Sequence, residues 1–252
     1  MKHKNVIYTC LTNSYDALSP ATNQKCDCIC FCDKESYELN KQVEGWSFRI
    51  VNNPTFNPKQ INRDYKMNPH KFLKDYNHSI YIDSNIILKK DLSPFFEYAY
   101  DQFSIYLYNH PDRNCAYKEI IKLAEVGLIE GDYAKRWFNF LKKEKLSQNN
   151  GFYECNIILR KHNENQCIKA MVQWSELYKS WNLRDQPSFA LIANNFNEIL
   201  FGLGQAKIRE GENEYFSIKL HHKKNPRLPR LFKRLVSEFN GSLQHMRSKI
   251  IR

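Results

Sequence analysis

Short runs of apolar residues recur along the first half of the chain, with stretches of helical spacing between them. The runs at 5–12, 26–33, 46–51 and 79–88 have the length of buried strands. Segment 57–75 has helical spacing and a break at Asn68-Pro69, and a further helix is expected within 91–101. Strands that alternate with helices in this way predict an α/β fold, a mostly parallel central sheet flanked by helices.

The second half has a less regular pattern. Strands are expected at 103–111, within 149–163 and around 214–222, and helices at 116–127 (closed by Gly127), 132–146, 164–181 and from Pro187 onward. No internal repeat or low-complexity linker interrupts the chain. We therefore predict one domain, residues 1–222, followed by a C-terminal helical tail, residues 223–252.

The cysteines alternate in one strand. Cys26, Cys28, Cys30 and Cys32 would share one face of that strand, which makes it a strand of small residues rather than a zinc knuckle, although zinc is the alternative. The first apolar run is too short for a signal peptide, and no window reaches the roughly 18 apolar residues of a membrane span. These features predict a cytosolic protein with reduced thiols.

The net charge of +11 is concentrated in the tail. Residues 219–252 carry ten Lys or Arg and one acid, a net +9, so the rest of the chain is nearly neutral. Leu228, Leu231, Phe232 and Leu235 recur at helical spacing among these charges. A basic amphipathic helix of this kind predicts binding to an anionic membrane surface at the inner face of the cytoplasmic membrane, and the alternative is a helix packed on the body.

Two polar residues interrupt an otherwise apolar run in "SIYIDSNIIL". Ligands of parallel sheets lie beyond the carboxyl ends of the strands, where Asp83 would fall. In an extended segment, Asp83 and Asn85 would point to the same side and offer oxygen ligands to Mg²⁺ or Mn²⁺. A turn or capping role for Asp83 is the ordinary alternative.

Four stretches in order carry a family resemblance: "KFLKDYNHSIYIDSNIILKKDL", "YNHPDRNCAYKE", "GFYECNIILRKHN" and "NLRDQPSFAL". Together they resemble nucleotide-sugar glycosyltransferases of the GT-A (Rossmann-like) fold over residues 6–194. The closer likeness is to a glycosyltransferase-like family formerly classed as a domain of unknown function, which occurs in plant cell-wall and mucilage proteins and in bacterial surface-polysaccharide clusters. The glycogenin-like family 8 enzymes are a more distant likeness.

The resemblance implies a donor site for a nucleotide sugar, with a UDP-sugar expected. Arg63 and Lys66 lie one helical turn apart and would contact the diphosphate, although a solvated helix face is the alternative. The residues that the resemblance places at the nucleotide and its phosphates are Tyr8, Thr9, Asn13, Asp33, Arg63, Lys66, Asp83, Ser84 and Asn85.

A divalent metal, Mn²⁺ or Mg²⁺, is the cofactor that the resemblance implies. Asp83 would bind it with help from Asn85, which departs from the usual second acid and makes metal dependence less secure. A late histidine, His221 or His222, would complete the shell. Adjacent histidines on a strand face opposite ways, so one of them at most would bind, and a basic surface patch is the alternative.

The segment "RDQPSF" would carry the catalytic residues. The resemblance implies that Asp185 orients the donor or acceptor hydroxyl and that Gln186 helps to stabilise the oxocarbenium-like transition state, while helix capping by Asp185 is the ordinary interpretation. The residues expected on the acceptor side are His110, Asp112, Arg113, Asn150 and Gly151.

The sequence thus predicts a glycosyltransferase that moves a sugar from a nucleoside-diphosphate donor to a glycan or lipid-linked glycan. The expected setting is surface polysaccharide biosynthesis, such as capsule, O-antigen or lipooligosaccharide, with retention of configuration. A catalytically silent scaffold of a polysaccharide-assembly complex is one alternative. A nucleic-acid-binding protein is the other, but the nearly neutral body makes nucleic acid an unexpected partner.

Overall fold

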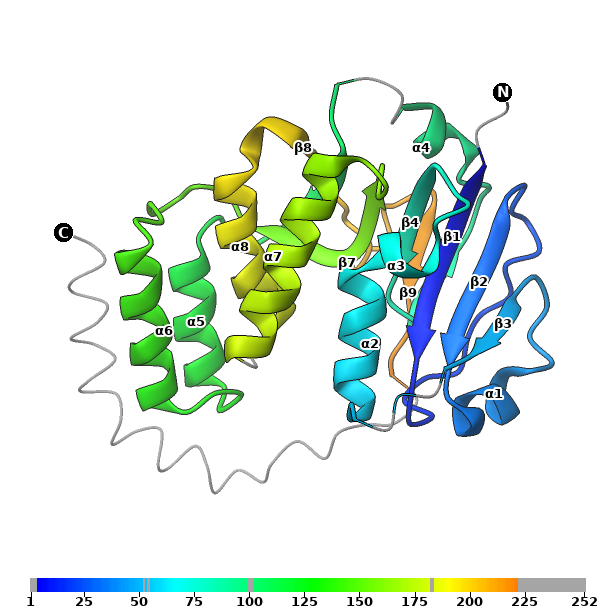
Figure 1. Ribbon diagram of the computed structural model, residues 1–252, viewed down its shortest axis with the longest axis horizontal. Coiled ribbons are helices and arrows are strands. Elements are labelled where there is room, and N and C mark those ends of the chain that lie inside the picture. Colours follow the sequence, from blue (N-terminus) through cyan, green and yellow to red (C-terminus); the bar gives the residue numbers. More distant parts are fainter. Residues whose placement is uncertain (1–3, 52, 54, 99–101, 182–183, 222–252) are drawn as a thin grey trace. The chain divides into compact units, whose positions relative to one another are not determined.

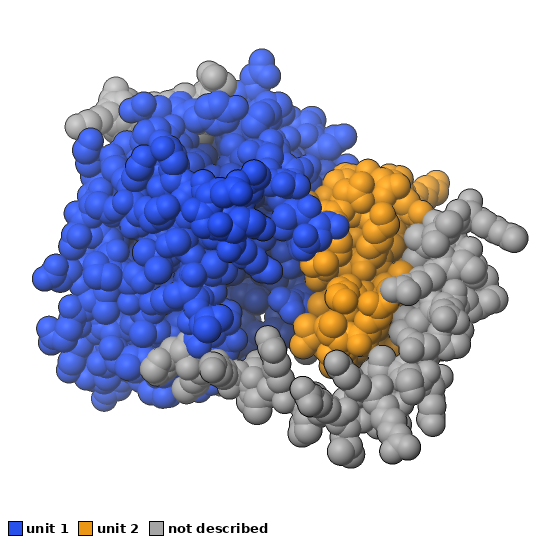
Figure 2. Space-filling view, turned by 180° about the vertical axis from the view of Figure 1, so that it is seen from behind, with its two compact units in different colours: residues 1–112, 153–223 blue, residues 113–152, 224–252 orange. Residues whose placement is uncertain are grey.

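A computed structural model describes residues 4–51, 53, 55–98, 102–181 and 184–221 (Figure 1). The chain divides into two compact units, coloured separately in Figure 2. Unit 1 contains residues 1–112 and 153–223, and unit 2 contains 113–152 and 224–252. The expected boundary at 222/223 and the basic tail lie outside the described residues.

A seven-stranded sheet forms the centre of unit 1, in the order β3-β2-β1-β4-β7-β6-β8. Each neighbouring pair is parallel except those that involve β7, which runs antiparallel to β4 and β6. The expected mostly parallel sheet is therefore confirmed. The strands span Asn5–Leu11 (β1), Asp27–Cys32 (β2), Ser47–Ile50 (β3), His78–Ile82 (β4), Ile105–Asn109 (β6), Tyr153–Arg160 (β7) and Leu200–Gln205 (β8).

Helices and a small ladder cover this sheet (Figure 1). The helices of unit 1 are α1 (Lys34–Asn40), α2 (Pro58–Met67), α3 (Pro69–Phe72), α4 (Ser93–Tyr98), α7 (Asn165–Trp181), α8 (Asp185–Asn195) and the 3₁₀ turn η1 (Asn197–Ile199). The ladder pairs β5 (Ile86–Leu88) with β9 (Phe216–Ile218) in antiparallel fashion. Asn68-Pro69 separates α2 from α3, as the sequence predicts.

Alternating residues of β1 supply two hydrophobic cores. Val6 and Tyr8 pack in a core with Met67 of α2 and Trp174 of α7. Ile7 points to the other face, into a core that contains the α4 and β9 side chains. The period of two in a strand thus places apolar side chains against helices on both faces of the sheet.

The strand β2 also alternates as expected. Ile29 and Phe31 enter the first core, whereas Cys30 and Cys32 pack with Leu11 and Leu18 on the opposite side. All eight cysteines are free thiols. In the described part of the chain, no helix is both long enough and apolar enough to cross a membrane.

Within the described residues, unit 2 is a pair of helices, α5 (Ala116–Glu125) and α6 (Gly131–Lys143). The rings of Tyr117 and Phe138 pack at a centroid distance of 4.7 Å, and the Tyr117 hydroxyl donates to the Leu146 carbonyl. Gly127 follows α5 with φ of 72°, which is the left-handed conformation that glycine adopts at a helix end.

Three elements differ from the sequence prediction. Helix α1 and strand β8 were not expected, and the apolar run 79–88 forms two strands, β4 and β5, rather than one. The sequence of β8, "LFGLGQ", contains two glycines, which weaken a strand pattern. Gly202 packs closely against β6: an added Cβ would lie 2.8 Å from the Asn109 Oδ1 atom, so the Asn109 side chain would have to shift.

Candidate functional site

The polar residues that interrupt the apolar run form a turn at the carboxyl end of β4. The Ile86 amide donates to the Asp83 carbonyl at 3.0 Å, and the Asp83 amide donates to the Asn156 carbonyl of β7 at 2.8 Å. The sequence predicted an extended segment here. Asp83, Ser84 and Asn85 instead form a turn, because small polar residues favour a turn at this point. The turn still places Asp83 at the sheet edge where ligands of parallel sheets bind.

A buried lysine holds two carboxylates at this edge. The Lys66 side chain is 1% exposed, and its Nζ atom lies 3.3 Å from Asp83 Oδ1 and donates to Asp185 Oδ2. The Tyr81 hydroxyl also donates to Asp83 Oδ1, at 2.9 Å. A buried ammonium is tolerated only when it is paired, so these contacts account for the position of Lys66.

Asp185 is the anionic centre of the cluster. The Arg63 Nε atom lies 3.7 Å from Asp185 Oδ2, so Arg63 and Lys66 use the same face of α2, as their spacing predicts. Burial opposes ionisation of the Asp185 carboxyl, but Arg63 and Lys66 outweigh burial and hold its pKa well below the ordinary value. Asp185 is therefore a carboxylate at neutral pH.

Helix capping was the ordinary interpretation of Asp185, but its side chain does not cap α8. The residue before it, Arg184, occupies the N-cap position of α8, and no side-chain hydrogen bond caps the helix. The Asp185 carbonyl accepts hydrogen bonds from Trp174 Nε1 at 3.2 Å and from Ser188 Oγ at 2.8 Å. These contacts fix the start of α8 while the carboxylate faces Lys66 and Arg63.

Arg160 contacts the backbone of Lys66 and was not identified from the sequence. It is fully buried, donates to the Lys66 carbonyl at 2.8 Å, and also donates to the Tyr8 hydroxyl. Tyr8 and Thr9 have no exposed surface, because β1 continues to Leu11. They were expected to line the nucleotide pocket, but the structure places them in the middle of the strand, beneath the site.

The loop after β1 is fixed by Asp33. This residue caps α1 through the Ser36 amide at 2.9 Å and also accepts from the Asn13 amide at 2.6 Å. Asn13 and Ser14 have φ of 60° and 47°, a left-handed conformation that is uncommon outside glycine. The two predicted nucleotide residues Asn13 and Asp33 are thus brought together.

A second carboxylate, Asp16, joins the turn to the late histidine. The Ser84 hydroxyl donates to Asp16 Oδ2 at 2.5 Å, and His221 Nδ1 lies 3.0 Å from the same oxygen. The Asn85 side chain donates to the Lys219 carbonyl at 3.2 Å. Asp16 was not identified from the sequence, and its position close to the end of the first strand was the available signal. His222 lies outside the described residues.

The available donor set fits a cation that arrives with a diphosphate. Within the described ranges, no three His, Cys, Asp or Glu side chains gather as a complete cage. The candidates are one carboxylate (Asp83), one amide (Asn85) and one imidazole (His221). Mg²⁺ sites commonly use one or two carboxylates together with substrate phosphates, so this set is sufficient in kind.

The remaining predicted residues are spread over both units. Gln186 is half-buried, and its amide lies 3.5 Å from the Tyr153 carbonyl. In unit 1, His110 Nδ1 accepts from the Asp112 amide at 3.1 Å. Unit 2 holds the other three acceptor-side residues: Arg113 pairs with Glu119, Gly151 donates to the Asn114 carbonyl with φ of 93°, and Asn150 is half-buried.

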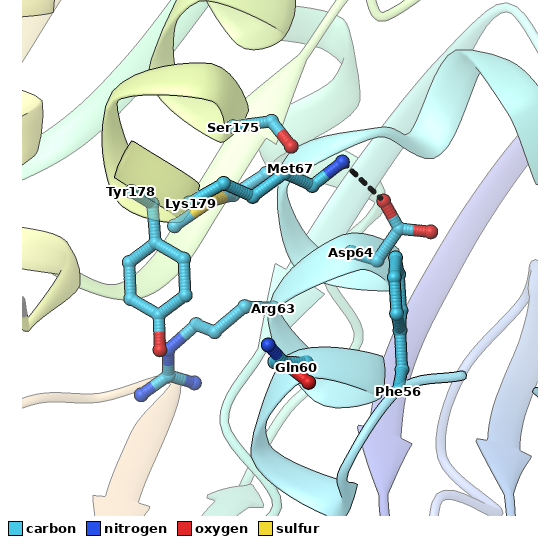
Figure 3. Close-up of a pocket in the computed structure, with 8 residues that line it drawn as sticks. All are labelled: Phe56, Gln60, Arg63, Asp64, Met67, Ser175, Tyr178 and Lys179. Atoms are coloured by element: carbon cyan, nitrogen blue, oxygen red, sulfur yellow. Dashed lines mark ion pairs between the residues drawn. The ribbon is translucent and has the colours of Figure 1, made fainter. Parts of the chain in front are cut away.

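A pocket of about 230 Å³ lies between α2 and α7 (Figure 3). Arg63 and Tyr178 form one wall, and the Lys179 ammonium lies 4.0 Å from the Asp64 carboxylate at another. The lining residues are Phe56, Gln60, Arg63, Asp64, Met67, Ser175, Tyr178 and Lys179. Arg63 is therefore shared between this pocket and the ion pair with Asp185.

Comparisons with known proteins bear on the family and the fold of the chain. The model of the TOD1/MUCI70 glycosyltransferase-like domain family matches residues 14–210. No curated protein sequence matches the chain. Among solved structures, the apo form of the bifunctional glycosyltransferase WbbM aligns with a TM-score of 0.52 at 12% identity, over 81% of this chain and 39% of that chain.

Two further structures are more distant matches. Apo mouse xyloside xylosyltransferase 1 has a TM-score of 0.49 at 11% identity, over 80% of this chain and 84% of its own. The galactosyltransferase LgtC, solved with donor and acceptor sugar analogues, has a TM-score of 0.45 at 11% identity, over 78% of this chain and 72% of its own. The family match covers most of the chain, and the WbbM alignment supports the fold expected from the sequence. The chain therefore belongs to the TOD1/MUCI70 glycosyltransferase-like domain family and is a glycosyltransferase with the GT-A fold.

Proposed function

We propose that the chain transfers a sugar from a nucleoside-diphosphate donor, with a UDP-sugar as the first candidate, to a glycan or lipid-linked glycan of a surface polysaccharide. The observation that carries this proposal is the charge cluster of Asp83, Asp185, Lys66 and Arg63 at the carboxyl edge of the sheet. A diphosphate needs positive charge, and a reacting sugar needs fixed acceptors for its hydroxyls.

In this proposal the cations and the anions of the cluster have different roles. Lys66 is enclosed by two carboxylates, so its role is to orient them rather than to reach the phosphates. Arg63 is more accessible, with 23% of its side chain exposed, and it is the cation that contacts the diphosphate. A divalent cation held by Asp83, Asn85 and His221 would neutralise further charge on the leaving group.

Asp185 and Gln186 face the reacting sugar in this scheme. Because Asp185 stays ionised, it accepts hydrogen bonds from sugar hydroxyls and does not act as a general acid. The Gln186 amide oxygen would stabilise positive charge at the anomeric carbon. Both carboxylates of the cluster are committed to Lys66, so neither is a free base for inversion. This favours retention, with the departing phosphate assisting the acceptor hydroxyl.

Thermal shift with UDP-, GDP-, CMP- and ADP-sugars, each with and without Mn²⁺, tests the donor site. We expect one nucleotide class to raise the Tm of the wild type only when Mn²⁺ is present, and Asp83→Ala to abolish the shift. A ligand at about 100 times its Kd adds about 2.7 kcal/mol of stability, which is readily measured.

Asp132→Ala is the matched control, because this aspartate lies on the surface of α6, with 83% of its side chain exposed. It should respond to the donor like the wild type. If no donor shifts the wild type, or if Asp83→Ala responds fully, the proposed donor site is wrong. The silent-scaffold alternative predicts the first of these outcomes.

A further inference from the structure

The Asp16 carboxylate connects two distant segments of unit 1. Its side chain is 1% exposed. One oxygen accepts from Ser84, in the turn after β4, and both oxygens lie within 3.1 Å of His221 Nδ1, beyond β9. A buried carboxylate with two such partners joins the turn after β4 directly to the segment beyond β9.

This contact determines which nitrogen of His221 carries the proton. An ionised carboxylate only accepts hydrogen bonds, so the ring nitrogen that faces it must be Nδ1–H. In neutral His221 the lone pair is then on Nε2. The Tyr15 ring, 4.8 Å from the imidazole centroid, packs against the same side chain. The ring is therefore held by a hydrogen bond and by an aromatic contact.

The backbone near His221 is held as well. The Lys219 amide donates to the Asn85 carbonyl at 2.9 Å, and the Asn85 side chain returns a bond to the Lys219 carbonyl. The Lys219 ammonium also donates to Ser19 Oγ at 3.0 Å. His221 is thus only two residues beyond a segment bound directly to the Asp83–Asn85 turn.

We propose that Asp16 is a positioning residue that holds His221 as the Nδ1–H tautomer, so that Nε2 is the atom presented to a divalent cation. This arrangement has the form of a carboxylate–histidine pair that orients a metal ligand. The proposal rests on the proposed donor site, and it selects His221 Nε2 as the late nitrogen ligand. Asp16 itself does not contact the cation.

The tautomer is measured by long-range ¹H–¹⁵N correlation of the histidine rings at pH 8, with His221→Gln assigning the signals. The wild type should show His221 as the Nδ1–H form. In Asp16→Ala the signals should move to a mixture with the Nε2–H form. Ser84→Ala is the matched control, because it removes the other partner of Asp16 and leaves the carboxylate, so the tautomer should not change.

Mn²⁺ affinity in the presence of UDP, followed by electron paramagnetic resonance, is the second measurement. Loss of an orienting carboxylate typically weakens metal binding about 10- to 100-fold, so Asp16→Ala should do so, Asp16→Glu should recover part of the loss, and Asp16→Ala/His221→Gln should be no weaker than His221→Gln. A wild-type Nε2–H tautomer, or Asp16→Ala with unchanged tautomer, overturns the proposal. So does an unchanged Mn²⁺ affinity. If Asp83→Ala also leaves Mn²⁺ binding intact, the proposed donor site itself is wrong. This result distinguishes failure of the donor site from failure of the Asp16 proposal alone.

Discussion

Lys66 is the residue on which the charge balance of the site depends. Removing its ammonium leaves Asp83 and Asp185 without their shared partner, and the loss of one member of a buried ion pair costs about 3–5 kcal/mol. We expect Lys66→Met to lower the free energy of unfolding by this amount in urea denaturation. Lys118→Met, at an exposed position of α5, should change it little.

A double variant distinguishes the effect of losing the ion pair from the effect of losing side-chain packing. Lys66→Met/Asp185→Asn removes an anion together with the cation, so it should recover part of the lost stability. If Lys66→Met costs less than about 1 kcal/mol, the lysine behaves as a surface ion pair and the two carboxylates do not depend on it.

His162 provides a pH-dependent contribution to stability. It is fully buried, and its Nε2 donates to the Leu73 carbonyl at 2.9 Å, while Nδ1 has no hydrogen-bond partner among the described residues. Burial lowers the pKa of His162 to about 4. Between that value and about 6.5 the unfolded chain binds more protons than the folded one, so stability falls as the pH falls through this window.

Because of this residue, we expect the free energy of unfolding to fall by about 3 kcal/mol between pH 7 and pH 4, since each unit of pKa difference corresponds to about 1.4 kcal/mol. Urea unfolding at a series of pH values measures it. His162→Gln should show a flatter dependence in this range, whereas His110→Gln, in a half-exposed turn, should keep the wild-type slope. Parallel curves for the wild type and His162→Gln would refute the assignment.

At the scale of elements, Gly202 of strand β8 packs closely against the Asn109 side chain of β6. Because an added Cβ at Gly202 would lie 2.8 Å from Asn109 Oδ1, and this oxygen accepts from the Gly204 amide, the side chain cannot move without losing a hydrogen bond. We expect Gly202→Ala to cost about 1–3 kcal/mol, as overpacking does. Thermal unfolding should show the loss.

Removing the obstacle tests the cause. In Gly202→Ala/Asn109→Ala the clash is absent. Gly202→Ala should therefore cost less stability in the Asn109→Ala background than in the wild type. If the cost is the same with and without Asn109, the glycine is required for another reason.

Elements of the fold were predictable where local pattern decides them. The alternation in β1 and β2 and the helical face shared by Arg63 and Lys66 follow from residue spacing alone. Strand β8 was missed because its glycines serve a contact with β6, which is not a local property. The partners of the site were also beyond local reasoning: Lys66 and Asp185 are 119 residues apart in sequence, and Asp16 and His221 are 205 apart.

At the scale of the whole molecule, the basic tail remains a prediction from the sequence. The tail, residues 223–252, lies outside the described structure, and the net charge of +9 carried by residues 219–252 suits an anionic surface. Each basic residue near such a surface contributes about 1 kcal/mol. Arg230→Glu/Lys233→Glu/Arg234→Glu should therefore lose binding to vesicles that contain phosphatidylglycerol, measured by sedimentation.

Vesicles of phosphatidylcholine alone are the control, and neither the wild type nor the variant should bind them strongly. Equal binding of both proteins to the anionic vesicles would remove the membrane role of the tail. It would also remove the support for placing the enzyme at the inner face of the membrane.

The pairing of β9 with β5 has a consequence for synthesis of the protein. The turn after β4 is translated well before the segment that secures it, because Asn85 and Lys219 are 134 residues apart in sequence. A nascent chain that is still attached to the ribosome before this segment emerges has an unsecured turn and lacks His221. During synthesis the turn after β4 therefore acquires the contacts that fix it only after residues 216–221 have emerged and β9 has paired with β5.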